Sequence, residues 1–257
     1  MTTDKTTDEQ LRTRARRLGF YGLVANWTDF GAEPWVPLLL DREDQERQHR
    51  SLERRIRQAR LEEFKQIADF DWAWPKQIDR DTVHELFSFQ FIGETANVVL
   101  AGPNGVGKTM IAKNVAQQAL LHGYTVRFTA GSAMLNDLAA QDGARALERR
   151  LKHYCQPQLL VIDEVGYFSY SNRHADLLFE VVNRRYQKLP IVITTNRPFD
   201  EWNTVFPNAA CVVALIDRLV HRAEIVTIAG DSYRLKEAND RAAAKAATRT
   251  RARKGAA

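Results

Sequence analysis

The sequence predicts an α/β fold in which helices cover a parallel β-sheet, with a small all-helical region ahead of it. Three observations indicate this fold class. Short apolar runs alternate with stretches of helical periodicity between residues 97 and 229, as strands and helices alternate in βαβ units. A glycine-rich loop, GPNGVGKT at 102–109, joins the first apolar run to a helical stretch. In the first 68 residues, apolar side chains recur at intervals typical of helices.

The N-terminal region is expected to be helical after a disordered start at residues 1–10. Helical periodicity extends from Gln10 to about Trp27, where a glycine and a proline then interrupt it. A long helix or helix pair is expected from about Trp35 to Ala68. Its arginines could follow a nucleic-acid backbone, but the interspersed glutamates fit a solvated, salt-bridged face equally well.

A sharp change of composition at DFDWAWP, residues 69–75, ends this helical region. Two tryptophans and a proline indicate a packed linker. Beyond it, we expect strands at 97–102, 124–130, 158–163, 189–195 and 224–229. We expect helices at 108–122, from Ser132 to about His153, at 174–188 and at about 210–222. The predicted domains are a helical N-terminal domain (1–68), an α/β domain (69–237) and a basic, disordered tail (238–257).

The positive charge of the chain is concentrated at its end. The formal net charge is +5, and residues 241–257 hold six basic residues and no acidic one. The remaining chain has 31 of the 37 basic residues against 32 acidic ones. This tail could contact DNA or RNA phosphates, or it could be a solvated, disordered end.

Composition and apolar patterning exclude several classes of protein. No apolar run approaches membrane-spanning length, and the segment MTTDKTTDEQ lacks the apolar core of a signal peptide. Two distant cysteines fit neither a disulfide scaffold nor a zinc site. We therefore expect a cytoplasmic protein without a membrane partner.

The loop GPNGVGKT has the order strand, glycine loop and helix that a phosphate-binding P-loop requires. Its glycines allow backbone N–H groups to point at phosphate oxygens, and the helix adds its positive dipole end. Lys108 should reach the β and γ phosphates, and the hydroxyl of Thr109 should ligate Mg²⁺. ATP and Mg²⁺ are therefore the expected cofactors. The expected nucleotide-binding residues are Gly102, Pro103, Asn104, Gly105, Val106, Gly107, Lys108, Thr109 and Met110.

Two further apolar runs end in polar residues suited to hydrolysis. LLVIDEVG, residues 159–166, ends in Asp163, which is placed to hold Mg²⁺, and Glu164, which is placed to polarise the attacking water. ITTNRP, residues 193–198, contains Asn196. This asparagine could orient the water near the γ-phosphate, or it could cap a helix that begins near Pro198.

Two arginines lie near the end of the α/β region. Arg218 belongs to DRL at 217–219, and Arg234 belongs to GDSYR at 230–234. Arginines there suggest contacts with the γ-phosphate, where they stabilise transition-state charge. From the residues alone, each is equally well explained as a partner in a surface salt bridge.

These motifs in order, together with the segment FDWAWPKQID, resemble the AAA+ ATPases of the IstB/DnaC group. The N-terminal half is similar to the IstB-like helpers of insertion-sequence transposition. The resemblance covers about residues 10–237. It implies an AAA+ P-loop core with strand order 5-1-4-3-2, a small helical N-terminal domain and little or no C-terminal lid. The basic tail is outside the shared pattern.

The resemblance also implies a function and partners. Such proteins assemble with ATP as homo-oligomers on double-stranded DNA, bend it, and recruit the transposase encoded by the same element. Nucleotides lie between subunits, so Arg218 matches a finger that acts in trans and Arg234 a second sensor that acts in cis. Arg145, Arg149 and Arg173 match positions that face DNA in an AAA+ spiral, although each could be an outward, solvated charge.

Two other functions stay open at this point. A DnaC-like replicative helicase loader shares the AAA+ motifs, but it would not need the FDWAWPKQID linker. A nucleotide or metabolite kinase shares the P-loop. The pair Asp163 and Glu164 counts against a kinase, because a water-activating glutamate beside the metal serves hydrolysis.

Overall fold

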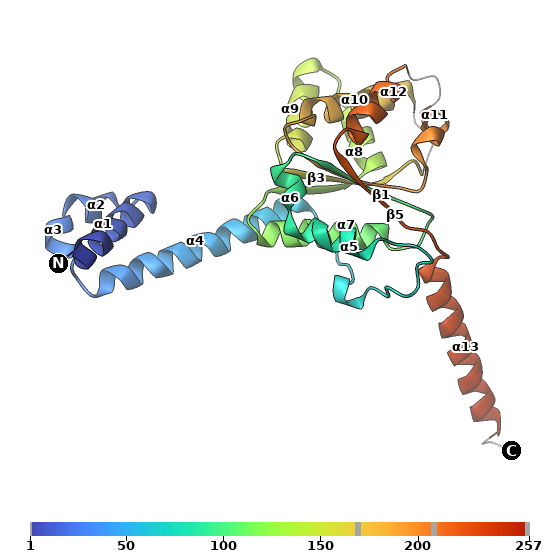
Figure 1. Ribbon diagram of the computed structural model, residues 1–257, viewed down its shortest axis with the longest axis horizontal. Coiled ribbons are helices and arrows are strands. Elements are labelled where there is room, and N and C mark those ends of the chain that lie inside the picture. The colour runs from blue at the N-terminus through green and yellow to red at the C-terminus, as the bar shows by residue number, and fades with distance from the viewer. Residues whose placement is uncertain (1, 168–170, 207–209, 255–257) are drawn as a thin grey trace. The chain divides into compact units, whose positions relative to one another are not determined.

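The computed structural model describes residues 2–167, 171–206 and 210–254, and the chain forms two compact units, residues 1–55 and 56–257 (Figure 1). The division comes earlier than the expected boundary at residue 68. Residues 65–69 belong to the second unit, where the Asn114 side chain accepts a hydrogen bond from the Ile67 N–H at 2.8 Å and donates one to the Lys65 carbonyl at 3.0 Å.

The first unit consists of helices. They are α1 (Thr2–Arg17), α2 (Tyr21–Ala25), α3 (Trp27–Phe30) and the start of α4 (Trp35–Ala59). Its core is formed by Ala15, Leu18, Val24, Trp27, Val36 and Leu40. The expected disorder is wrong for residues 2–10, because α1 begins at Thr2; residue 1 of that prediction lies outside the described residues. The Asp8 carboxylate accepts a hydrogen bond from the Trp27 indole at 2.9 Å, which anchors this first part of α1.

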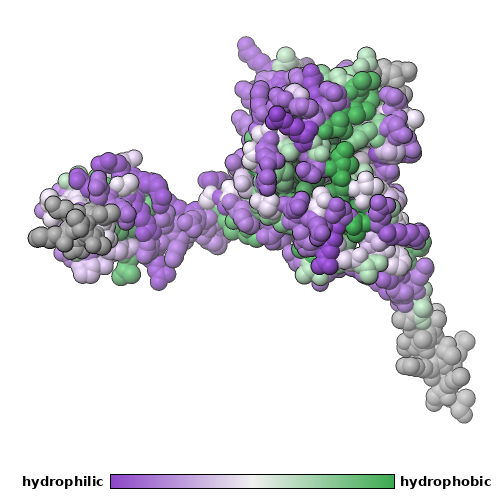
Figure 2. All heavy atoms as spheres, viewed as in Figure 1, coloured by the Kyte–Doolittle hydropathy of each residue, from purple (hydrophilic) through white to green (hydrophobic). Residues whose placement is uncertain are grey.

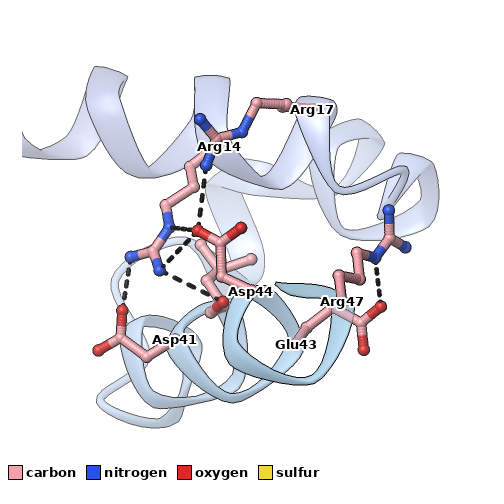
Figure 3. A network of polar contacts seen from close by, with 7 residues as sticks. Arg14, Arg17, Asp41, Glu43, Asp44 and Arg47 are labelled. Atoms are coloured by element: carbon pink, nitrogen blue, oxygen red, sulfur yellow. Dashed lines mark hydrogen bonds and ion pairs between the residues drawn. The ribbon is translucent and has the colours of Figure 1, made fainter. Parts of the chain in front are cut away.

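Ion pairs join α1 to α4 at the edge of this core (Figure 3). The Arg14 guanidinium lies 2.6 Å from Asp41 and 3.1 Å from Asp44, and Arg17 lies 3.0 Å from Asp44. Helix α4 ends at Ala59 rather than continuing to Ala68, because Arg60 takes a left-handed conformation with φ of 56° that ends helices.

The surface of α4 is mostly hydrophilic (Figure 2). Its charges pair along the helix at the i, i+4 spacing, as in Arg47 with Glu43 and Arg50 with Glu46. Such exposed pairs contribute roughly 0.3–0.5 kcal/mol each. These pairs favour the solvated, salt-bridged interpretation of this helix over a nucleic-acid contact.

The second unit is built on a five-stranded sheet in which all neighbouring strands are parallel. The strands are β1 (Asn97–Ala101), β2 (Val126–Ala130), β3 (Leu159–Val165), β4 (Ile191–Thr195) and β5 (Ala223–Thr227). Their order, β2-β3-β4-β1-β5, confirms the expected order 5-1-4-3-2. The strand tips that carry the predicted site residues therefore meet at one edge of the sheet.

Helices and short 3₁₀ turns connect the strands. Before β1 lie η1 (Ile67–Asp69), α5 (Arg80–Glu85), η2 (Leu86–Ser88) and α6 (Gln90–Gly93). Between β1 and β4 lie α7 (Lys108–Leu121), α8 (Gly131–Ala139), α9 (Ala144–Cys155) and α10 (Asn172–Arg185). After β4 come η3 (Phe199–Glu201), α11 (Trp202–Val205), α12 (Val212–Val220) and α13 (Tyr233–Lys254). None of the helices in these described ranges is long and apolar enough to cross a bilayer.

Two predictions are corrected, one of a single helix and one of a disordered tail. The single helix expected from Ser132 to His153 is two helices, α8 and α9, because Gly143 adopts an extended conformation and Ala130, not Ser132, precedes the first turn. The disordered tail expected at 238–257 is helical as far as Lys254, since alanine and arginine have high helix propensity. Residues 255–257 of that prediction lie outside the described residues.

A buried arginine fixes the loop between α9 and β3. Arg185 is 1% exposed, and its guanidinium donates to the carbonyls of Pro157 at 2.7 Å, Cys155 at 3.0 Å and Pro190 at 2.7 Å. Burial lowers the pKa of Arg185 to about 10. Arg185 thus donates to backbone carbonyls just before β3 and just before β4, which stabilises both loops.

Candidate nucleotide-binding site

The P-loop connects β1 to α7 and has the backbone conformation that its glycines permit. Gly105 and Gly107 have φ angles of 81° and 102°, which side chains rarely adopt. Their surroundings are also closed to a side chain. A Cβ at Gly105 would collide with Ser232, and one at Gly107 would collide with the Phe70 ring. Both glycines are therefore required by conformation and by space.

Lys108 begins α7 and is only 4% exposed. Its ammonium donates hydrogen bonds to the Gly102 and Pro103 carbonyls, both at 2.7 Å. Burial lowers the pKa of Lys108 to about 8, and the Asp163 charge offsets part of that effect. The lysine thus binds its own loop at the place where phosphate oxygens would be stronger partners for a buried ammonium.

A buried hydrogen-bond network joins the P-loop to β3 and β4. The Asp163 Oδ1 accepts from the Thr109 hydroxyl at 3.0 Å and from the Thr194 hydroxyl at 2.5 Å. The Thr194 oxygen in turn accepts from the Glu164 N–H at 2.9 Å. A hydroxyl beside a carboxylate suits Mg²⁺, which takes few protein oxygens and completes its shell with phosphates and water. Thr109 and Asp163 therefore fit the expected metal site.

Glu164 is held in a strained backbone conformation. Its φ is 60°, and the register of β3 against β4 shifts between Ile162 and Val165. This irregularity places Glu164 in a bulge. A left-handed conformation costs a non-glycine residue roughly 1–2 kcal/mol, and such strain is typical of functional sites. The Thr194 hydroxyl, by accepting from the Glu164 N–H, holds this bulge in place.

An aromatic wall completes the pocket beside the P-loop. The linker 69–75 and the segment around Tyr233 line it beside the P-loop, and a concave site with this lining suits a small-molecule ligand. The Trp74 indole donates to the Asp231 carbonyl at 2.9 Å, and the Tyr233 N–H donates to the Gly105 carbonyl at 3.0 Å. Trp74 and Tyr233 also lie edge to face, 6.1 Å apart. Such aromatic faces can pack against a base.

Several of the predicted site residues line this pocket. P-loop residues from Gly105 to Met110 line it together with Arg234. The positive charge of Arg234 lowers the pKa of Lys108. The negative charges of Asp163 and Glu164 raise the pKa of Lys108. The packed linker predicted from the two tryptophans is confirmed by the Phe70–Trp72 contact at 4.7 Å and by the Trp74 contacts described above.

Asn196 is one of two predicted site residues that have a buried polar atom without a hydrogen-bond partner in the described ranges; the other is Arg218. The Asn196 Oδ1 is buried and has no hydrogen-bond partner among the described residues. Pro198, not Asn196, precedes the 3₁₀ turn η3, and that turn has no side-chain cap. The structure therefore does not support the capping alternative for Asn196. Its unpartnered oxygen, at the tip of β4, is an available hydrogen-bond acceptor.

Arg218 lies apart from the residues that line this pocket. It is near the end of α12, with its guanidinium 4.5 Å from the Phe179 ring centroid and 5.9 Å from that of Tyr186. Its Nη1 is buried without a hydrogen-bond partner in the described part of the chain. The stacking on these two rings holds the Arg218 side chain in place and leaves its Nη1 able to donate a hydrogen bond.

The arginines that matched DNA-facing positions are also away from the residues lining the pocket. Arg145 and Arg149 are exposed on α9, and Arg173 is exposed in the first turn of α10. Sequence reasoning missed Thr194 and the aromatic wall. The threonine had one signal: it lies two residues before Asn196, on the strand that pairs with β3.

Comparison with known proteins identifies related sequences. The model of the family described as IstB-like ATP binding protein matches residues 8–241. The ATP-binding protein described for insertion sequence IS5376 of Geobacillus stearothermophilus is 35% identical over 77% of this chain and 79% of its own length. The one described for insertion sequence IS21 of Pseudomonas aeruginosa is 36% identical over 78% of this chain and 76% of its own length.

Solved structures share the fold at low sequence identity. The crystal structure of DnaI covers 65% of this chain and 89% of its own, with a TM-score of 0.52 and 16% identity. The replication initiator DnaA bound to AMPPCP and single-stranded DNA covers 63% of this chain and 52% of its own, with a TM-score of 0.51 and 18% identity. These likenesses confirm an AAA+ P-loop fold.

Proposed function

This chain belongs to the family of IstB-like ATP binding proteins, and we propose that it is an Mg²⁺-dependent ATPase that regulates transposition. It assembles on duplex target DNA when ATP is bound, remodels that DNA, and recruits or stimulates the transposase of its element. Hydrolysis then drives disassembly. The relatives described for insertion sequences support the transposase as partner, and the cytoplasm is the compartment we expect.

The observation that carries the proposed hydrolysis is the network that joins Thr109, Asp163, Thr194 and Glu164. It brings the P-loop, β3 and β4 together at one point. In this proposal, Thr109 and Asp163 hold Mg²⁺, which neutralises charge on the phosphates. Glu164 accepts a proton from the attacking water, and the unpartnered Asn196 Oδ1 accepts a hydrogen bond that orients this water.

The arginines divide between the two sides of a subunit interface in this proposal. Arg234 lines the pocket of its own subunit, so it contacts the phosphates in cis. Arg218 is apart from this pocket and keeps an unpartnered Nη1, which supports a contact with the nucleotide of a neighbouring subunit. ATP then stabilises the assembly because it contacts both subunits.

The proposed DNA contacts are made by Arg145, Arg149 and Arg173.

The test of the whole proposal is particle size, measured on a short DNA duplex and on a matching single strand, each with ATP, with ADP and without nucleotide. We expect large, defined particles on the duplex with ATP. A preference for the single strand would support a helicase loader instead, and no assembly under any condition would contradict both.

We expect Arg218→Ala to bind ATP with unchanged affinity while losing hydrolysis and assembly. The loss should be about 10³-fold in turnover, the lower end for arginine fingers. The measurement is ATPase rate and particle size on duplex DNA. Arg222→Ala, which removes an exposed arginine on the turn before β5, serves as the control. Full ATPase activity in Arg218→Ala would remove the role in trans.

We expect Thr194→Val to lower ATP turnover and to destabilise the fold. The valine leaves the partly buried Glu164 N–H without its acceptor, which costs up to roughly 1–3 kcal/mol. Thr194→Ser keeps the hydroxyl and should retain most of the turnover. Thr195→Val is the matched control, since that hydroxyl bonds to the Arg197 backbone rather than to Asp163.

The informative measurements for this prediction are kcat, KM and the free energy of unfolding for all three variants. A role in positioning Asp163 and Glu164 predicts a fall in kcat in Thr194→Val that Thr195→Val does not share, even if both are destabilised. Equal kcat values in the two valine variants would leave Thr194 with a structural role alone.

A further inference from the structure

Two ion pairs join the segment before β1 to the first turn of α13, beside the nucleotide pocket. The Lys65 ammonium lies 2.6 Å from the Glu237 carboxylate. The Lys236 ammonium lies 3.1 Å from the Asp71 carboxylate. The pairing is reciprocal, because each segment supplies one lysine and one carboxylate. We call these four residues the clasp, and its pairs connect positions that are 172 and 165 residues apart in the sequence.

The clasp belongs to the wall of the pocket. Lys65, Asp71 and Glu237 line the pocket together with the aromatic residues Trp74 and Tyr233. The Lys236 ammonium lies 4.4 Å from the ring centroid of Trp74 and 5.2 Å from that of Tyr233. The Lys65 ammonium lies 5.9 Å from the Tyr233 centroid. Ammonium groups at these distances attract aromatic faces, so the clasp also affects the placement of both rings.

Both pairs stay charged over a wide range of pH. The hydrogen bond from Lys65 lowers the pKa of Glu237, and the one from Lys236 lowers the pKa of Asp71. The same two bonds raise the pKa of the lysines. All four side chains reach solvent, so either pair alone contributes little to the stability of the fold. Their importance lies in what they connect.

The two connected segments have separate anchors near the P-loop. The segment before β1 is fixed to α7 by the buried Asn114 side chain. The first turn of α13 is fixed to the P-loop by the bond from the Tyr233 N–H to the Gly105 carbonyl. Residues 238–243 are all exposed, so packing does not hold α13 beyond this turn. The Tyr233 bond and the clasp therefore position Arg234, which lines the pocket from this turn.

We propose that the clasp holds Arg234 at the phosphates and sets the rate at which nucleotide leaves the pocket. The inference rests on the nucleotide site of the proposed function, and it does not depend on DNA or transposase. A nucleotide that leaves between the two segments parts them, so both ion pairs break before it is released. In many enzymes the release of product, rather than the chemistry, limits turnover. The clasp would then determine how long ADP stays bound after hydrolysis.

The test uses two single charge reversals and their combination. Lys65→Glu and Glu237→Lys each place like charges together, and the double variant restores the pair with its charges exchanged. Glu62→Lys is the matched control, because its carboxylate also faces a lysine, Lys113 at 3.7 Å, but is not among the residues that line the pocket. Release of a fluorescent ADP analogue is followed after excess unlabelled ADP is added, with Mg²⁺ present. Single-turnover hydrolysis of ATP and the unfolding temperature without nucleotide are measured on the same proteins.

We expect each single reversal to speed ADP release about fivefold, the upper end for one exposed ion pair. The double variant should return release to within about twofold of the native rate, and Glu62→Lys should leave it unchanged. The two single variants change the net charge in opposite directions. A purely electrostatic effect on the anionic nucleotide would therefore speed release in Lys65→Glu and slow it in Glu237→Lys, and that result would overturn the clasp.

The other measurements separate positioning from a structural role. Single-turnover hydrolysis, which release does not affect, should fall in both single variants and recover in the double variant, while the unfolding temperature changes little. Unchanged release in both single variants, or faster release that the double variant does not reverse, would overturn the clasp. A native chain that binds ADP but does not hydrolyse ATP would contradict the proposed hydrolysis and leave the release test valid. A native chain that binds no ADP would contradict the nucleotide site itself, and the clasp with it.

Discussion

Lys108→Ala should bind ATP at least about 100-fold more weakly than the native chain, a loss of about 2.7 kcal/mol. Lys108 is the buried cation of the P-loop, and its ammonium is satisfied by the Gly102 and Pro103 carbonyls. Phosphate oxygens would replace these carbonyls with charge-assisted bonds. Alanine offers no donor, so the triphosphate would lie in a partly desolvated site without its counter-charge. Titration with a fluorescent ATP analogue measures this loss.

Lys113→Ala is a matched control for this variant. Lys113 is on the same helix, 3.7 Å from Glu62 and over the Phe128 ring, and it is not among the residues that line the pocket. Its removal deletes one positive charge but should leave ATP affinity within about twofold, because partly exposed pairs contribute little. Unchanged ATP affinity in Lys108→Ala would show that the phosphate site has been assigned wrongly.

The pH dependence of binding gives a second readout of the same residue. Burial lowers the pKa of Lys108 to about 8, and bound phosphates would raise that pKa again. Below pH 8 the lysine is already protonated, so binding needs no proton there. Above pH 8 the free site must take up a proton on binding, so affinity falls as pH rises. Calorimetry in buffers of different ionisation enthalpy should detect this uptake in the native chain and in Lys113→Ala, but not in Lys108→Ala.

The central strands β1, β3 and β4 could be located from sequence because each is a short apolar run that is buried on both faces. Val98, Val99 and Leu100 in β1 are fully buried, as are Leu159 to Ile162 in β3. The strand order did not follow from such runs. It came from the resemblance to AAA+ proteins, since apolar runs do not specify which strands are neighbours.

Helix boundaries were harder to predict because local breaks depend on single residues. Gly143 splits a stretch whose apolar periodicity continues on both sides of it. The two terminal segments were expected to be disordered, yet α1 is anchored by the Asp8–Trp27 bond. Helix α13 has the alanine and arginine content that favours a helix.

The site shows the same division between local and long-range information. Lys108, Thr109 and Asp163 lie in motifs whose spacing predicts their positions. The partners of Thr194 depend on the register between β3 and β4, and on a bulge that no local pattern reveals. The contact between Trp74 and Asp231 joins residues 157 positions apart. Only the folded chain brings such residues together.

Substitution of the strained residue Glu164 should have the second large effect, a loss of ATP turnover. We expect Glu164→Gln to keep ATP affinity and to lower ATP turnover by roughly 10²–10⁴-fold, the contribution of a general base. Glutamine has the size of glutamate and the same backbone cost at φ of 60°, so the variant removes the proton acceptor without rearranging the bulge. Since hydrolysis drives disassembly in the proposed function, particles formed on duplex DNA with ATP should persist. Phosphate release and particle lifetime are the two measurements.

Two further variants separate catalysis from strain. Glu224→Gln makes the same change at an exposed position of β5 and should leave turnover unchanged. Glu164→Gly also lacks the carboxylate, but glycine adopts a positive φ without steric cost. We expect this variant to be inactive and yet more stable than Glu164→Gln by about 1 kcal/mol. Turnover within tenfold of the native rate in both Glu164 variants would show that another group accepts the proton. A less stable glycine variant would show that the bulge is held by the glutamate side chain rather than imposed by β4.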